Sequence, residues 1–168
     1  MIANHSPKLF FALWPDDAVR SALAKLQAPV QGRLIPPEKL HLTLAFLGHQ
    51  PAERLPVLRG ILESLSVPPL RLEIDCYGYF TKPRIAWAGM SRIPPELNML
   101  YEDLMAKLGE EGFAPATHGA FRPHITLARE AKAAPPRQPF EAVIWEVREA
   151  ALVESVMATG QYLPLAPR

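Results

Sequence analysis

The chain has 168 residues, of which 49% are hydrophobic and 21% are charged, as in an ordinary globular protein. Its formal net charge of +1 excludes a protein-wide positive field, so any nucleic-acid site must be local. Cys76 is the only cysteine, which excludes an internal disulfide and a cysteine metal cluster.

In the first half of the chain, strand patterns and helix patterns alternate. Lys8 to Trp14 is an apolar run that predicts a buried strand. This run is too short for a signal peptide or a membrane span, so we expect a cytoplasmic protein without a membrane partner. Asp16 to Gln27 places its apolar residues on one helical face. Leu40 to Leu47 predicts a second strand, and Ala52 to Leu65 predicts a second helix.

The second half contains one helix pattern among several strand patterns. Leu70 to Tyr79 and Arg84 to Met90 predict two strands joined as a hairpin through Thr81-Lys82-Pro83. Glu96 to Glu111 predicts a helix, because its leucines follow one helical face and Gly112 can end it. Three further strands are predicted at Phe121 to Arg129, Phe140 to Val147 and Ala150 to Met157.

This order of elements predicts an α+β fold with antiparallel sheets, because strands joined by loops outnumber helical crossovers. One short sequence motif occurs twice, near the middle of each half of the chain. We therefore expect two pseudo-symmetric lobes, with antiparallel sheets flanked by helices and an active-site cleft between them. Residues 1–168 would form a single bilobal domain.

The motif His41-Leu42-Thr43-Leu44-Ala45 recurs almost unchanged as His124-Ile125-Thr126-Leu127-Ala128. Alternate strand residues face the same way, so each His would project with the Thr two positions later. The apolar neighbours would take the opposite face and pack in the core, and we expect Phe46 among them. A single strand His is more often a core residue, but a duplicated His-x-Thr favours a functional site in a shared groove.

Two imidazoles and two hydroxyls suit the cleavage of a phosphodiester. A neutral imidazole can take a proton from water, and an imidazolium can give one to a departing ribose oxygen. Thr hydroxyls can donate hydrogen bonds to the phosphate oxygens and stabilise the transition state. These steps need no metal and no cofactor. The sequence also lacks the third ligand and the His-x-x-x-His spacing that a zinc site would need.

The paired motifs resemble those of the two-histidine (2H) phosphoesterase superfamily. The similarity is closer to its bacterial and archaeal RNA 2′,3′-cyclic phosphodiesterases, historically called 2′-5′ RNA ligases. It extends to Lys8-Leu9-Phe10-Phe11-Ala12-Leu13, to Leu44-Ala45-Phe46-Leu47-Gly48 and to Phe121-Arg122-Pro123. The resemblance implies a bilobal α+β fold, with His41 as proton donor to the O3′ leaving group and His124 as proton acceptor from water. The local sequence alone does not assign these two roles.

Two arginines near the second motif are candidate phosphate ligands. Arg129 follows the motif, where these enzymes often carry a basic residue. Strand alternation places Arg129 on the face opposite His124, so it reaches the site only if a bulge or the strand end redirects it. Arg122 shares the parity of His124 and reaches either the cleft or a salt bridge at its rim. The histidines at positions 5, 49 and 118 have no Thr partner and receive no role.

The sequence therefore predicts hydrolysis of RNA or nucleotide 2′,3′-cyclic phosphate ends to 2′-phosphates. Thr43, Thr126, Arg122 and Arg129 would bind the substrate. The expected partners are RNA ends or small nucleotides with a cyclic phosphate, and the expected state is a monomer. The alternatives are 2′-5′ RNA ligation or 2′-5′ oligonucleotide cleavage at the same site, and a non-catalytic RNA- or nucleotide-binding module.

Overall fold

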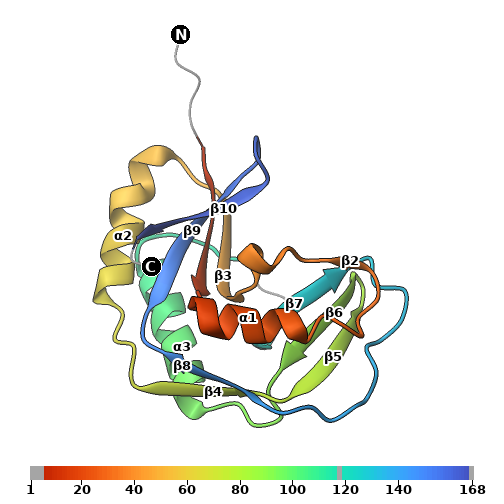
Figure 1. Cartoon of the computed structure of the whole chain (residues 1–168). Helices are drawn as coiled ribbons and strands as arrows, with labels where there is room; N and C mark the ends of the chain where they lie inside the picture. The colour runs from red at the N-terminus through yellow and green to blue at the C-terminus, as the bar shows by residue number, and fades with distance from the viewer. Residues whose placement is uncertain (1–5, 117–118, 167–168) are drawn as a thin grey trace.

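The computed structural model describes residues 6–116 and 119–166. Within these residues, an eight-stranded sheet has the strand order β10-β9-β1-β3-β7-β6-β5, with β2 paired to β7 (Figure 1). One half of this sheet consists of β1 (Lys8–Leu13), β3 (Leu42–His49), β9 (Ala150–Val156) and β10 (Gln161–Ala166). The other half consists of β2 (Arg33–Leu34), β5 (Cys76–Thr81), β6 (Arg84–Gly89) and β7 (Ile125–Arg129). A separate two-stranded sheet pairs β4 (Leu70–Ile74) with β8 (Val143–Val147).

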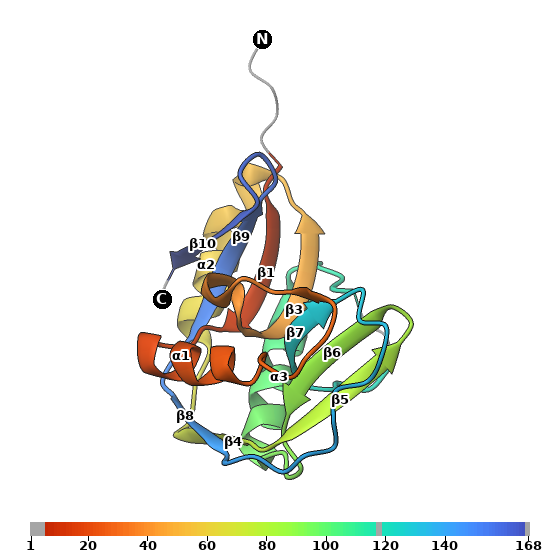
Figure 2. The same cartoon turned by 45° about the vertical axis from the view of Figure 1, so that its right-hand side comes forward.

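The helices pack against the strands and bury one apolar face each. They are α1 (Asp17–Lys25), α2 (Leu55–Ser64) and α3 (Pro95–Glu110), with short 3-10 turns η1 (Pro37–Lys39) and η2 (Ala52–Arg54). Helix α1 begins where the Asp16 carboxylate accepts a hydrogen bond from the Val19 amide at 2.9 Å. Helix α2 contacts β9 and α3, while α1 contacts β8 (Figures 1 and 2). The leucines of all three helices join one core cluster beneath the strands.

The two halves of the large sheet meet where the motifs lie. Strands β3 and β7 are antiparallel and pair through Leu42 and Ile125, which directly follow His41 and His124. Leu42 and Ile125 are the second residues of the two motifs, and their strands run in opposite directions. The two motifs are therefore related by a local two-fold axis at this junction. The predicted α+β architecture with antiparallel sheets and flanking helices is confirmed.

The segment Leu70 to Tyr79 is two strands, so the prediction of one continuous strand was wrong. Strand β4 pairs with β8, whereas β5 pairs with β6 in the other sheet. The change of sheet occurs at Asp75, whose carboxylate accepts hydrogen bonds from the Ser91 amide at 2.8 Å and the Ser91 hydroxyl at 2.5 Å. The Asp75 amide also donates to the Gly89 carbonyl at 2.9 Å, so the corner is held by both backbone and side-chain bonds. The predicted hairpin between β5 and β6 is confirmed.

Two strands were not predicted, and the strands predicted at Phe121 to Arg129 and Phe140 to Val147 are shorter than expected. Strand β10 forms a hairpin with β9, and the short β2 pairs with the end of β7. Strand β7 begins at Ile125 rather than at Phe121, so His124 lies directly before the strand, as His41 lies before β3. Both histidines therefore occupy the position directly before a strand.

Candidate active site

The six predicted site residues line one cavity of about 700 Å³. They are His41, Thr43, Arg122, His124, Thr126 and Arg129. The two motif strands contribute from opposite sides of the β3–β7 junction. The wall also includes residues of β5, β6, β10, α3 and η1, and of the loops between elements. The structure thus brings both motifs and both candidate arginines to the same hollow.

Each histidine is held by a backbone carbonyl two residues earlier in the chain. Nδ1 of His41 donates to the Lys39 carbonyl at 2.6 Å, and Nδ1 of His124 donates to the Arg122 carbonyl at 2.7 Å. Because a carbonyl only accepts, Nδ1 carries the proton in both rings. Nε2 is therefore the nitrogen of each ring that is available for proton transfer.

The ring of His41 is enclosed by three aromatic side chains. Its centroid lies 4.9 Å from that of Phe10, 5.7 Å from Trp14 and 5.5 Å from Tyr162. The pKa of His41 is lowered to about 4, chiefly by burial among these rings and also by the positive charges of Arg20 and Arg129. Nε2 of His41 forms a 2.8 Å hydrogen bond with Oγ1 of Thr43, as the predicted pairing of motif residues requires.

The ring of His124 has a different and more open environment. Its centroid lies 5.0 Å from Phe80 and 5.9 Å from Trp87. Burial lowers the pKa of His124, and the positive charges of Arg122 and Arg129 lower it further. Among the described residues, no hydrogen bond to Nε2 of His124 is formed, although Thr126 lines the same cavity.

A β-bulge turns Arg129 toward the cavity. In the β6–β7 ladder, Trp87 pairs with Thr126 and Ala86 with Ala128, so Leu127 is skipped. The extra residue reverses the alternation, and Arg129 faces the side of Thr126. This is the bulge required by the prediction that Arg129 reaches the site. The guanidinium of Arg122 lies 5.1 Å from the ring of Phe80 at the same cavity.

Two β-bulges in the pairing of β1 with β3 turn Phe46 out of the core. In the β1–β3 ladder, the partners of Phe10 and Phe11 are Phe46 and Ala45, while Leu44 and Leu47 are skipped. Phe46 therefore leaves the core face, is 49% exposed and lines the cavity. The prediction of a core Phe46 assumed unbroken alternation and was wrong.

The cavity wall is cationic, although the whole chain is nearly neutral. Lys39, Lys82, Arg122 and Arg129 line it, and the described part of the wall holds no carboxylate. Such a concentration of positive charge in a hollow attracts anions and strengthens their contacts with donors inside. The positive charge is therefore concentrated locally, as the net charge of +1 requires of any nucleic-acid site in this chain.

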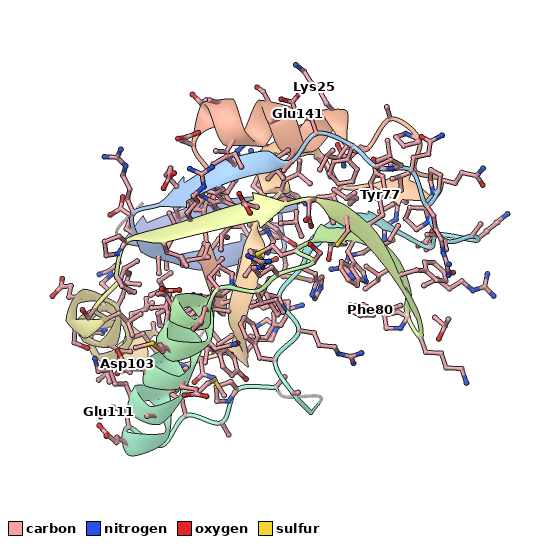
Figure 3. The ribbon with its side chains drawn as sticks, turned by 90° about the horizontal axis from the view of Figure 1, so that it is seen from below. Lys25, Tyr77, Phe80, Asp103, Glu111 and Glu141 are labelled. Carbon is pink, nitrogen blue, oxygen red and sulfur yellow. The ribbon has the colours of Figure 1, made fainter. Side chains whose placement is uncertain are left out.

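Several lining residues were missed by the sequence analysis. Tyr162 comes from the unpredicted β10 and contacts both His41 and the ammonium of Lys39, which lies 4.9 Å from its ring. Thr159-Gly160 followed by Tyr162 was a turn signal that could have predicted the β9–β10 hairpin. Phe80, which Figure 3 labels on β5, had no motif to mark it.

Of the three histidines that received no role, His49 is among the described residues. His49 is exposed and its Nδ1 donates to the Ser6 carbonyl at 2.8 Å, outside the cavity. His5 and His118 lie outside the described residues. In residues 6–116 and 119–166, no group of three His, Cys, Asp or Glu side chains could hold a metal ion. None of the helices in this part of the chain combines the length and the apolar character that a membrane span needs.

The arrangement presents two Nε2 atoms, two hydroxyls and several cations to one hollow. Comparison with known families agrees with this chemistry, because the model of the 2′-5′ RNA ligase superfamily matches residues 15–158. The chain belongs to the 2′-5′ RNA ligase superfamily.

Similar members of this superfamily cover nearly the whole chain. An RNA 2′,3′-cyclic phosphodiesterase of Thermus thermophilus is 38% identical and covers 88% of this chain and 81% of its own. The enzyme of the same name from Escherichia coli is 33% identical and covers 94% and 93%. The crystal structure of E. coli LigT complexed with 3′-AMP superposes with a TM-score of 0.85 at 32% identity, covering 96% and 97%. The resemblance read from the two motifs is confirmed.

Proposed function

We propose that this protein hydrolyses 2′,3′-cyclic phosphates on RNA ends or small nucleotides, leaving a 2′-phosphate and a free 3′-hydroxyl. The observation that carries the proposal is the pair of histidines that line one cationic cavity, each with its Nδ1 hydrogen-bonded to a backbone carbonyl. The superfamily relatives named RNA 2′,3′-cyclic phosphodiesterase support the reaction, and the relative complexed with 3′-AMP supports a nucleotide in the cavity.

In this mechanism His124 is the proton acceptor. Its Nε2 has no hydrogen bond to another described residue, so a water molecule can bind there. Nε2 takes a proton from that water as the water oxygen attacks phosphorus. The hydrogen bond from Nδ1 to the backbone carbonyl of Arg122 keeps the orientation of the ring and stabilises the imidazolium that forms.

His41 is the proton donor to the leaving oxygen. Its protonated Nε2 gives a proton to O3′ as the bond between phosphorus and O3′ breaks, so O2′ keeps the phosphate. The aromatic enclosure lowers the pKa of His41 and makes its imidazolium a stronger acid. A bound phosphate anion raises that pKa, because an opposite charge favours the protonated ring. Binding of the anionic substrate therefore favours uptake of a proton from solvent by His41.

The hydroxyls and guanidinium groups bind the phosphate. Thr43 and Thr126 donate hydrogen bonds to the non-bridging oxygens, and the charges of Arg122 and Arg129 offset the negative charge that grows in the transition state. In the free protein Thr43 is bonded to Nε2 of His41. A substrate phosphate would therefore redirect that hydroxyl as the His41 ring becomes protonated.

The test is incubation with an RNA that ends in a 2′,3′-cyclic phosphate, followed by phosphorus NMR of the product. We expect the 2′-phosphate isomer as the product. A 3′-phosphate would reverse the assigned roles of His41 and His124, or the orientation of the substrate. Binding of the RNA without turnover would instead support a non-catalytic binding module.

A further inference from the structure

We propose that a basic groove beside the active-site cavity binds backbone phosphates of the RNA that precedes the cyclic end, so that oligonucleotides are preferred over cyclic mononucleotides. The proposal rests on the proposed function and names its substrate class. The groove has a volume of about 430 Å³ and lies on β2, β6 and the end of β7. Its lining consists of Arg33, Pro83, Arg84, Ile85, Arg129, Glu130 and Lys132.

The groove and the active-site cavity are neighbours. Pro83, Ile85 and Arg129 line both hollows. A chain whose terminal phosphate lies beside Arg129 can therefore continue into the groove without crossing the core. At Arg129, β7 pairs with β2 through Arg33 and with β6 through Ile85, so the end of β7 joins the cavity to the groove (Figure 1).

The charges of the groove fit a polyanion. Four cationic side chains line it against a single carboxylate among the described residues, that of Glu130. The Arg33 guanidinium lies 3.4 Å from this carboxylate, and both side chains are largely exposed, at 63% and 74%. An ion pair this exposed contributes little stability. Glu130 thus leaves most of the positive charge of the groove available to a ligand.

The pairing of β2 with β7 places two like charges opposite each other. Arg33 is the cross-strand partner of Arg129, and like charges at such positions destabilise a sheet. A phosphate between or beside the two guanidinium groups removes this repulsion and can accept hydrogen bonds from both. The arrangement is costly without an anion and favourable with one.

The backbone of β2 is held firmly against β7. Gly32 has φ +116°, and a Cβ there would lie 2.8 Å from the Arg129 carbonyl oxygen, so this close approach requires glycine. The buried Gln27 donates to the carbonyls of Ile35 at 2.7 Å and Leu127 at 3.0 Å, which fixes the segment after β2. Arg33 is therefore presented from a fixed backbone rather than from a free loop.

The test uses the triple variant Arg33→Gln, Arg84→Gln, Lys132→Gln and a 5′-fluorescein RNA octamer ending in a 2′-phosphate. Fluorescence anisotropy at several salt concentrations gives Kd. We expect Kd to rise about 10-fold at low salt in the variant. The slope of log Kd against log salt should fall by about 2, because each phosphate contact with a single strand contributes about 0.7.

A matched control removes the same charges elsewhere. Lys25→Gln, Arg59→Gln, Arg92→Gln also replaces two arginines and one lysine, all exposed and outside both hollows. Figure 3 shows Lys25 on α1, apart from Phe80 of the active site. This control should leave Kd and its salt slope close to wild type. Glu130→Gln should act in the opposite direction to the groove variant and tighten binding, because it removes a negative charge.

Turnover of a 2′,3′-cyclic mononucleotide tests the site separately from the groove. We expect the groove variant to keep the wild-type kcat/KM for this short substrate, since no phosphate enters the groove. An unchanged octamer Kd in the variant, or an equal loss in the matched control, overturns the groove proposal. Because the binding measurement needs no turnover, this outcome is distinct from a failure of the proposed function, which would appear as a mononucleotide that is not hydrolysed.

Discussion

The two halves of the active site start from nearly the same pentapeptide and differ in their surroundings. His41 is enclosed by Phe10, Trp14 and Tyr162, and its Nε2 is hydrogen-bonded to Thr43. His124 has two aromatic neighbours and no hydrogen bond from Nε2 to a described residue. The backbone carbonyl two residues before each motif fixes the tautomer of its ring, whereas the neighbouring side chains decide how each ring can exchange a proton.

This difference agrees with the assigned roles. An acid benefits from an enclosed ring whose imidazolium readily gives up its proton, and burial lowers the pKa of His41 to about 4. A base benefits from an Nε2 that water can reach, as at His124.

Removing either histidine should have the largest effect. His41→Ala and His124→Ala should each lower kcat by about 100-fold or more, because general acid and general base catalysis each contribute at least that much. Circular dichroism should show little change in fold, since both rings border the cavity. His49→Ala is the matched control, because His49 is exposed and outside the cavity. A near wild-type rate in either cavity variant would rule out the two-histidine mechanism.

Removing a hydroxyl should have a smaller effect than removing an imidazole. Thr43→Ala and Thr126→Ala should each cost about 1–3 kcal/mol of transition-state stabilisation, measured from kcat/KM. The Ser variants should keep most of the activity. If Ser behaves like Ala at one of the two positions, the Thr methyl matters there for packing. Only the other Thr would then bind the phosphate through its hydroxyl.

The pH dependence should show the lowered pKa values of both rings. The rate falls at low pH as His124 becomes protonated and at high pH as His41 loses its proton. Because both pKa values lie below 6.5 in the free protein, kcat/KM should be bell-shaped with its maximum below pH 6.5. The maximum for kcat should lie at a higher pH, since a bound anion raises both values.

Variants can assign the limbs of that profile. The limbs of the wild-type profile belong to the coupled pair rather than to single residues. His41→Ala should lose the high-pH limb, and His124→Ala should lose the low-pH limb. A kcat/KM maximum above pH 7.5, or the loss of the opposite limb in either variant, would contradict the environments described for the two rings.

Chelation should have the smallest effect. Both proton transfers are assigned to side chains, so EDTA should leave the initial rate unchanged. Rates with and without EDTA, and with added Mg²⁺ or Zn²⁺, check this. Activity that is lost with EDTA and restored by a divalent ion would mean that a metal does the work assigned to one of the histidines.

The local sequence determined the helix ranges, the side chains that share the cavity and the tautomer of both histidines. The helices lie close to the ranges that their apolar spacing predicted, since burial of one helical face depends on residues three and four apart. The motif pair predicted which side chains share a hollow. The hydrogen bond from each ring to the carbonyl two residues earlier is also local, which explains why His41 and His124 share one tautomer.

Tertiary structure decided the rest, because it depends on partners distant in the chain. The bulges that turn Phe46 and Arg129 into the cavity arise from pairing with β1 and β6. The break at Asp75 follows from a change of partner strand. Tyr162 reaches His41 only because β10 folds back on β9. A motif therefore specifies which groups are present, while the packing around it sets their direction, their burial and the pKa of each histidine.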